Sequence, residues 1–276
     1  MRVYVSVDME GVAGVSHAAP TAREDNGYAA AVDLMVGEAN ASIEGAFDAG
    51  ATEVVVNDSH GSMFNLVPER MDRRARLVQG TKPFSMVEAA HDGHFDVALF
   101  VGYHARAGHP RGTIAHTYSA KPTLTSIGGR PVGEYGINGL FLGGLGVPVG
   151  LVTGDDALAE EVESWLPWAE RVVVKRAVSR QAADSLHPHE ARRLIRDGSR
   201  RAVARAVARD GLQPLRVQPP IVVELEFANA GEADYAAVIP GFSRVGDRGV
   251  RYEAGDAFEA YRAFVSAVRM ARLGDE

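Results

Sequence analysis

Acidic and histidine side chains follow successive strand-like segments in the first half of this sequence. The residues are Asp8 and Glu10 after the first segment, His60 after the second, His104 after the third, and Glu134 farther along. Carboxylate oxygens and imidazole nitrogens are common zinc ligands in proteins. Each of these residues alone would more often be an ordinary loop residue, but their recurrence at three strand ends predicts a metal site.

The spacing of Asp8 and Glu10 supports this prediction. Side chains alternate along an extended segment, so residues two positions apart point to the same side. Two carboxylates side by side repel each other, and both stay charged most easily when a cation lies between them. The pair therefore favours a divalent ion at the end of the first strand.

The number of donors indicates two metal ions. If one carboxylate bridges both ions, the five side chains supply three bonds to each, and a bridging water completes about four ligands on each ion. We assign the bridging position to Asp8. Paired ions roughly 3.5–4 Å apart are typical of hydrolases, and coordination lowers the pKa of water toward about 7, which supplies hydroxide as a nucleophile. The carboxylates would also favour a free ammonium group on a substrate and repel a carboxylate.

His116 lies between His104 and Glu134 and is not needed for this coordination. Three roles remain open for it: general acid or base, stabilisation of the transition state, or an additional metal ligand. The other histidines follow no core strand and are interpreted as residues without a functional role: His17, His91, His94, His109, His187 and His189.

The elements that must position these residues form an α/β pattern over the first 175 residues. The predicted strands are Arg2–Val7, Glu53–Asn57, Asp96–Gly102, Pro148–Thr153 and Arg171–Lys175. Their near-continuous apolar runs are typical of parallel strands buried on both faces. Helical periodicity between the first two strands runs from Val32 to Phe47, before Gly50. The pattern predicts an open, mostly parallel sheet flanked by helices, and such sheets bind ligands at the carboxyl ends of their strands.

The remaining segments predict a smaller C-terminal α+β portion. Within the first 175 residues, three short β-like pieces before a helix over Glu134–Leu145 predict a hairpin or a loop excursion: Thr113–Ser119, Thr123–Ile127 and Arg130–Gly133. Later elements are an arginine-rich helix over 188–209, a strand at Ile221–Phe227 and a helix over Asp256–Leu273. We therefore predict an α/β metal-binding catalytic domain over residues 1–175, with residues 176–276 packed on it.

Composition excludes several other kinds of protein. The chain of 276 residues contains no cysteine, which excludes disulfides, iron–sulfur clusters and cysteine nucleophiles. A net charge of −7 argues against a nucleic-acid partner, and the arginines of 188–209 are interpreted as a solvated helix face. No apolar run approaches the roughly 18 residues of a membrane span, and the first residues lack the pattern of a secretory signal. We therefore expect a cytoplasmic protein without a membrane partner.

Several ordered motifs resemble one known family, the DppA-type D-aminopeptidases of metallopeptidase family M55. The motifs that surround the predicted donors are Ser6-Val7-Asp8-Met9-Glu10-Gly11, Val56-Asn57-Asp58-Ser59-His60, Gly102-Tyr103-His104-Ala105-Arg106 and Arg130-Pro131-Val132-Gly133-Glu134. Further matching motifs are Lys82-Pro83-Phe84-Ser85-Met86-Val87-Glu88, Val152-Thr153-Gly154-Asp155-Asp156 and Glu226-Phe227-Ala228-Asn229. The resemblance extends over about residues 2–272.

This resemblance implies an aminopeptidase with two zinc ions per subunit that acts on short peptides with a D-amino acid at the amino terminus. It implies the same metal ligands: Asp8, Glu10, His60, His104 and Glu134. It assigns a catalytic role to His116. It also implies a ring-like homo-oligomer whose enclosed channel would keep folded proteins from the site.

Two alternatives remain open. The segments around Asp8 and Asp155 superficially resemble the acidic motifs of haloacid-dehalogenase-type phosphatases, which use magnesium. That chemistry has no use for histidines at strand ends, and nitrogen ligands favour zinc. Capping of a helix is the simpler interpretation of Asp155. The second alternative is a non-catalytic α/β module that binds a metal or ligand, which an activity assay would distinguish.

Overall fold

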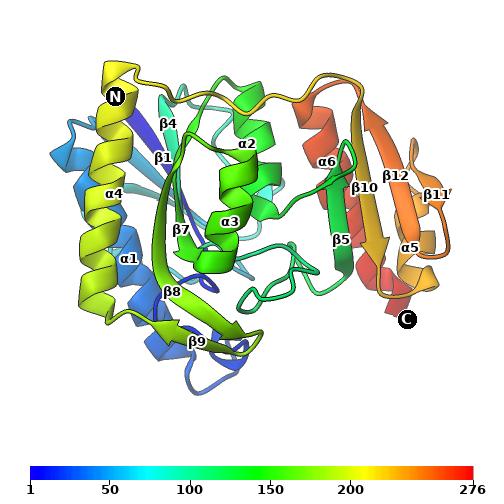
Figure 1. Ribbon diagram of the computed structural model, residues 1–276, viewed down its shortest axis with the longest axis horizontal. Coiled ribbons are helices and arrows are strands. Elements are labelled where there is room, and N and C mark those ends of the chain that lie inside the picture. The colour runs from blue at the N-terminus through cyan, green and yellow to red at the C-terminus, as the bar shows by residue number, and fades with distance from the viewer. Residues whose placement is uncertain (276) are drawn as a thin grey trace.

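A seven-stranded sheet forms the larger part of the computed structural model, which describes residues 1–275 (Figure 1). Its strand order is β3-β2-β1-β4-β7-β8-β9. The strands are β1 (Arg2–Val7), β2 (Glu53–Asp58), β3 (Arg76–Val78), β4 (Val97–Val101), β7 (Val149–Asp155), β8 (Glu170–Ser179) and β9 (Ala182–Ser185). All neighbours are parallel except β8 and β9, which pair antiparallel.

Alternating apolar side chains explain why this sheet is covered on both faces. On β1, Val3, Val5 and Val7 belong to one hydrophobic core, whereas Tyr4 belongs to the other. Phe100 on β4 lies in the same core as Tyr4. Successive side chains of a strand point to opposite faces, so β1, β2, β4 and β7 contribute to both cores.

The two faces carry different helices. On one face, α1 (Tyr28–Asp48) packs against α4 (Pro188–Ala208), and residues of α2 (Glu134–Gly144) and α3 (Asp156–Trp165) belong to the core on the other. A Cβ atom on Gly45 would lie 2.2 Å from the Arg196 carbonyl oxygen, so glycine allows α1 and α4 to approach closely. The exposed arginines of α4 form ion pairs with carboxylates, as expected of a solvated face.

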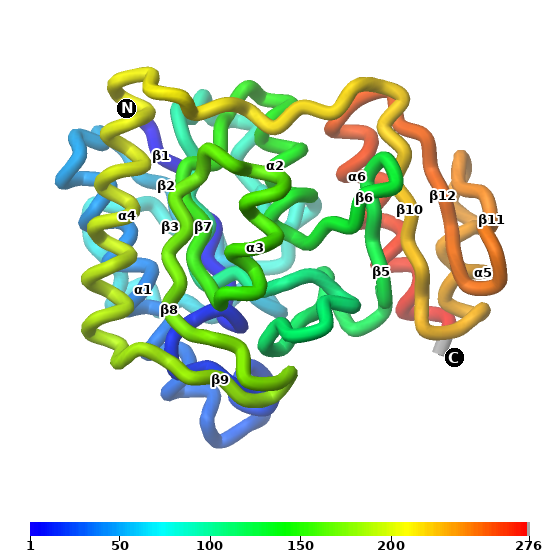
Figure 2. The backbone as a smooth tube through the Cα atoms, in the orientation of Figure 1, coloured from blue at the N-terminus to red at the C-terminus, as the bar shows by residue number. Residues whose placement is uncertain are grey.

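A second, antiparallel sheet has the order β11-β12-β10-β5-β6. Its strands are β5 (Pro122–Ile127), β6 (Arg130–Pro131), β10 (Ile221–Phe227), β11 (Ser243–Val245) and β12 (Gly249–Ala254). The helices α5 (Ala230–Ala237) and α6 (Ala257–Ala271) pack on this sheet, and α6 also contacts α2 of the larger sheet's helix layer. Figure 2 shows residues 209–220 crossing from α4 to β10, which lies beside β5.

The predicted fold class is confirmed, and each of the five predicted strands of the parallel sheet is present with small differences at its ends. Of the three β-like pieces, Thr113–Ser119 forms no strand: it is a loop with a single isolated bridge between Thr117 and Ser119, so here the alternative of a loop excursion holds. Strands β3, β9, β11 and β12 and helix α5 were not predicted from the sequence. The missed β3 and β11 are only three residues long and lie at sheet edges, so they lack the apolar runs of buried strands.

The predicted division into residues 1–175 and 176–276 stays a prediction. The boundary between the two sheets does not coincide with residue 175. The first sheet continues through residue 175 within β8, and the second takes β5 and β6 from before it. No helix in the described part of the chain is long and apolar enough to cross a membrane. The predicted cytoplasmic location stays a prediction.

Candidate metal centre

The five predicted metal donors lie together at the carboxyl edge of the parallel sheet. In the strand register, Val7 is the partner of both Asp58 and Val101, so the loops after β1, β2 and β4 begin side by side. These loops carry Asp8, Glu10, His60 and His104, and Glu134 is the first residue of α2. All five side chains are buried.

Asp8 lies between the two histidines. Its Oδ1 atom is 3.3 Å from His60 Nδ1, and its Oδ2 atom is 3.4 Å from His104 Nε2. His60 Nδ1 is also 2.9 Å from Glu10 Oε2, and His104 Nε2 is 3.3 Å from Glu134 Oε1. Two triads that share Asp8 therefore result, each with one imidazole nitrogen and oxygens from two carboxylates.

Backbone carbonyls fix which nitrogen of each ring carries hydrogen. His60 Nε2 donates to the Thr21 carbonyl at 2.9 Å, and His104 Nδ1 donates to the Ala105 carbonyl at 3.0 Å. In the neutral rings, the other nitrogen has a lone pair, and it is this nitrogen that faces the carboxylates. Buried His104 Nε2 has no hydrogen-bond partner within residues 1–275. A lone pair facing carboxylate oxygens is repulsive without a cation, so this donor set fits a metal ion.

The pKa values show the same demand for positive charge. Burial and the neighbouring Glu10 raise the pKa of Asp8. Burial would also raise the pKa of Glu10, but the nearby histidines His60, His116 and His104 hold the pKa of this carboxyl well below its usual value. Burial would lower the pKa of His60 and His104, yet the adjacent carboxylates raise both well above their usual value. Three buried carboxylates thus need cations, which bound protons or metal ions can supply.

Close packing fixes the loop that carries Asp8 and Glu10. A Cβ atom on Gly11 would lie 1.8 Å from the Tyr103 carbonyl oxygen, so only glycine permits this approach to the loop after β4. From β8, buried Lys175 donates from Nζ to the carbonyls of Glu10 and Val15, both at 2.5 Å, and to that of Val12 at 3.2 Å.

The loop of His60 is fixed by Asp58, the last residue of β2. The Asp58 carboxylate accepts hydrogen bonds from the backbone N–H groups of Asn65 and Leu66, at 2.5 and 2.7 Å. The Asn65 side-chain amide then donates to the His60 carbonyl at 2.7 Å. Asp58 therefore supports the loop that positions His60.

His116 lies on an irregular loop beside the triad of Asp8, His104 and Glu134. Its ring stacks on that of His104, with centroids 4.0 Å apart, and Nδ1 donates to the Ile114 carbonyl at 2.9 Å. Its Nε2 is 3.9 Å from Glu134 Oε1. Ile114 and Tyr118 both have left-handed backbone conformations, with φ of 54° and 61°, which are strained for such side chains. This geometry leaves both acid–base and ligand roles open to His116.

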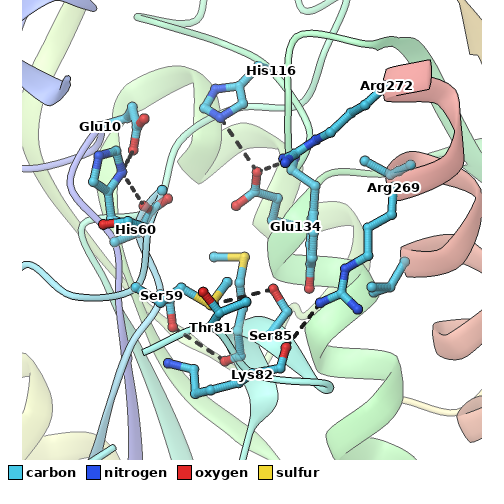
Figure 3. A pocket seen from close by; sticks show the side chains of 18 residues that line it. Glu10, Ser59, His60, Thr81, Lys82, Ser85, His116, Glu134, Arg269 and Arg272 are labelled. Carbon is cyan, nitrogen blue, oxygen red and sulfur yellow. Dashed lines mark hydrogen bonds and ion pairs between the residues drawn. The ribbon is translucent and has the colours of Figure 1, made fainter. Parts of the chain in front are cut away.

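A cavity of about 420 Å³ opens beside the donor set. Figure 3 shows Glu10 and His60 on one side, His116 and Glu134 in the middle of the view, and the side chains of Arg269 and Arg272 reaching in from the side opposite His60. Lys82, Val265 and Val268 also line it. Among the described residues, no histidine interpreted as lacking a functional role lines this cavity.

The basic residues of this cavity were not predicted from the sequence. Arg269 and Arg272 are three positions apart, so they share one side of the chain's last turns. From sequence alone they resemble any solvated helix end. Only the packing of α6 beside α2 brings them to the metal edge.

The chain was compared with known proteins. Residues 1–266 match the model of peptidase family M55, described as D-aminopeptidase. A D-aminopeptidase of Bacillus subtilis (strain 168) is 39% identical over 273 residues, covering 98% of each chain. The solved structure of the Zn-dependent D-aminopeptidase DppA from Bacillus subtilis, described as a self-compartmentalizing protease, superposes with a TM-score of 0.91. It is 38% identical, with 99% of this chain and 98% of that chain covered.

Proposed function

Because the chain belongs to peptidase family M55, the D-aminopeptidases, we propose that it is a zinc-dependent aminopeptidase with two zinc ions per subunit. Its substrates are short peptides with a D-amino acid at the free amino terminus. The observation that carries the proposal is the position of Asp8, whose two carboxylate oxygens face two different histidines. One carboxylate with this orientation suits a bridge between two ions.

Asp8, Glu10 and His60 would hold one ion, and Asp8, His104 and Glu134 the other. Zinc bound there would polarise the scissile carbonyl and lower the pKa of water toward about 7. Hydrogen bonds to backbone carbonyls orient both histidine ligands: the Thr21 carbonyl accepts from His60, and the Ala105 carbonyl accepts from His104. The Tyr118 N–H donates to Glu134 Oε1 at 2.6 Å and fixes that carboxylate.

His116 is the proton carrier of this proposal. Its Nδ1 is held by the Ile114 carbonyl, so Nε2 is the atom that can take up and release a proton. The side chain is 22% exposed and lines the cavity, where it can reach a bound peptide. Protonated Nε2 would deliver the proton that the leaving amine needs when the peptide bond breaks. The acidic wall formed by Asp8, Glu10 and Glu134 favours a free ammonium group on the first residue.

The phosphatase alternative finds no support at Asp155. One carboxylate oxygen of this residue accepts from the Leu158 N–H at the start of α3, and the other accepts from the Thr113 N–H, both at 2.8 Å. Both oxygens thus have a structural partner, which agrees with the predicted helix cap. The non-catalytic alternative is tested by the assay of zinc-dependent peptide hydrolysis that follows.

The decisive experiment measures release of the first residue from four substrates: D-Ala-D-Ala, L-Ala-L-Ala, N-acetyl-D-Ala-D-Ala and casein. We expect the free D-dipeptide to be cleaved when zinc is present and not when it is chelated, because the metal site performs the chemistry. Preference for the L-dipeptide would contradict the D-specificity, equal cleavage of the acetylated peptide would contradict recognition of the amine, and activity unaffected by chelation would contradict the metal.

Replacement of the imidazole ligands tests the metal assignment directly. We expect His60→Ala or His104→Ala to lower the zinc content per subunit and to abolish hydrolysis, because each removes the only nitrogen of its triad. Elemental analysis of the purified variants measures this. His94→Ala is the matched control, since His94 is exposed and outside the cavity. Full zinc occupancy in both ligand variants would refute the assignment.

We also propose that the chain assembles into a ring-like homo-oligomer. The support is its similarity over nearly its whole length to DppA, the self-compartmentalizing protease. In such an assembly, the substrate would have to be small enough to enter an enclosed space.

A further inference from the structure

The cavity beside the metal donors has charges of opposite sign at its two sides. Asp8, Glu10 and Glu134 supply carboxylates on the donor side. Across the cavity lie the guanidinium groups of Arg269, on the last turn of α6, and Arg272, just after it (Figure 3). A ligand that matches both sides carries a positive charge at one end and a negative charge at the other.

The two arginines have donors available for such a ligand. Arg269 donates from Nη2 to the Lys82 carbonyl at 3.0 Å, which anchors the guanidinium against the cavity wall. Among the side chains of residues 1–274, neither arginine forms an ion pair with a carboxylate, although acidic residues outnumber basic ones by 36 to 29. The guanidinium group is planar and can bind a carboxylate through two parallel hydrogen bonds.

The cavity wall that carries the arginines is partly apolar. Val265 and Val268 of α6 line the cavity together with the arginines. A volume of about 420 Å³ lies in the range of small-molecule sites. Such a surface accommodates the short side chains and backbone of a small peptide between the two charged sides.

We propose that Arg269 and Arg272 bind the carboxyl-terminal carboxylate of the substrate. The inference rests on the proposed aminopeptidase function and adds to it a preference for short peptides whose carboxyl terminus is also free. The acidic donors alone would repel a carboxylate, as the sequence suggests. The arginines remove this repulsion at the far side of the cavity and make the carboxylate a recognised group.

The test compares D-Ala-D-Ala with D-alanyl-D-alaninamide, which has the same amine and the same scissile bond but no carboxylate. With zinc-loaded enzyme, we expect the amide to have a KM higher by on the order of 10- to 100-fold, as for a lost charged hydrogen bond, with a similar kcat. Arg269→Gln and Arg272→Gln should raise the KM of D-Ala-D-Ala toward that of the amide and leave the kinetics of the amide unchanged. The double variant covers the case in which either arginine suffices.

Arg262→Gln is the matched control, because Arg262 is exposed on the same helix but does not line this cavity. This variant removes one positive charge and should leave the KM and kcat of both substrates unchanged. The inference is overturned if the wild-type enzyme cleaves the acid and the amide equally well, or if the double variant slows both to the same extent. If zinc-loaded enzyme hydrolyses neither substrate, the proposed function fails, and this inference fails with it.

Discussion

Which nitrogen of a histidine is free depends here on a single backbone carbonyl. His60 presents Nδ1 to the carboxylates because Thr21 holds Nε2, and His104 presents Nε2 because Ala105 holds Nδ1. His116 presents Nε2 in the same way as His104, through Ile114. Identical side chains therefore face the site through different atoms, and the surrounding backbone sets their orientation.

His116 is the residue whose role differs from that of its neighbours. We expect His116→Ala to keep both zinc ions and to lose on the order of 10²–10⁴-fold in kcat, because it removes an acid–base group. Steady-state kinetics together with elemental analysis on the same preparation measure both quantities. Zinc loss in this variant would instead identify His116 as a ligand, because its ligand atom lies within 4.8 Å of those of His104 and Glu134.

Sequence alone predicted the residues that follow core strands. Asp8, His60 and His104 come one to four positions after apolar runs, and parallel strands bring their carboxyl ends to one edge. Arg269 and Arg272 could not be found in this way, because their place depends on how α6 packs against α2. Periodicity predicts that a helix has a buried face but not which partner it meets.

At the scale of elements, the loop after β1 is supported by a strand and a helix distant in sequence. Lys175 of β8 binds three carbonyls of this loop, and Glu38 of α1 accepts a hydrogen bond from the Ala13 N–H at 2.8 Å. Both side chains are buried, and the second oxygen of Glu38 has no partner among the residues described. Burial raises the pKa of Glu38 to about 7, against the opposing effects of Ala13 and Lys175.

This pKa predicts a pH-dependent stability with a definite sign. Between the ordinary value of 4.5 and about 7, the unfolded chain loses the Glu38 proton while the folded chain keeps it. The contribution of protonated Glu38 to the free energy of unfolding is therefore fully present below pH 4.5, and it is lost as the pH rises through this window. We expect Glu38→Gln to gain stability relative to the wild type from pH 5 to pH 8, by up to about 3 kcal/mol.

Urea unfolding of the metal-stripped proteins at each pH measures this difference. Asp33→Asn is the control, because Asp33 is an exposed carboxylate on the same helix, and its difference from wild type should stay constant. Parallel stability profiles for wild type and Glu38→Gln would show that Glu38 is ionised in the folded protein.

The loop of His116 shows where prediction from patterns ends. Its β-branched and aromatic residues suggested a strand over Thr113–Ser119, but the segment is held by hydrogen bonds from outside. Arg180, at the turn between β8 and β9, accepts from the Ile114 N–H at 2.8 Å through its carbonyl and donates to the Ala115 carbonyl at 2.5 Å. Tertiary contacts thus override local β propensity.

At the scale of the whole molecule, the site combines two parts of the chain. The parallel sheet supplies the metal donors, and the helix that follows the antiparallel sheet supplies the opposite wall of the cavity. The sheet strands β5 and β10 pair although about a hundred residues separate them in sequence, which places α6 beside α2. The carboxylates of Asp8 and Glu10 thus come from the first part, and the guanidinium groups of Arg269 and Arg272 come from the second.

This architecture and the proposed ring together predict exclusion of folded substrates. We expect a peptide amide that begins with D-alanine to be cleaved when free, and the same peptide to resist cleavage when joined to a folded carrier protein. The carrier is too large for a cavity of about 420 Å³ and for an enclosed channel. The amide serves as the free form because it lacks the carboxylate, so size is the only difference.

The proposed ring itself is tested by sedimentation, which should show a species several times the mass of one chain. Equal cleavage rates, or a monomer at assay concentration, would contradict the enclosed assembly and leave the metal site unaffected.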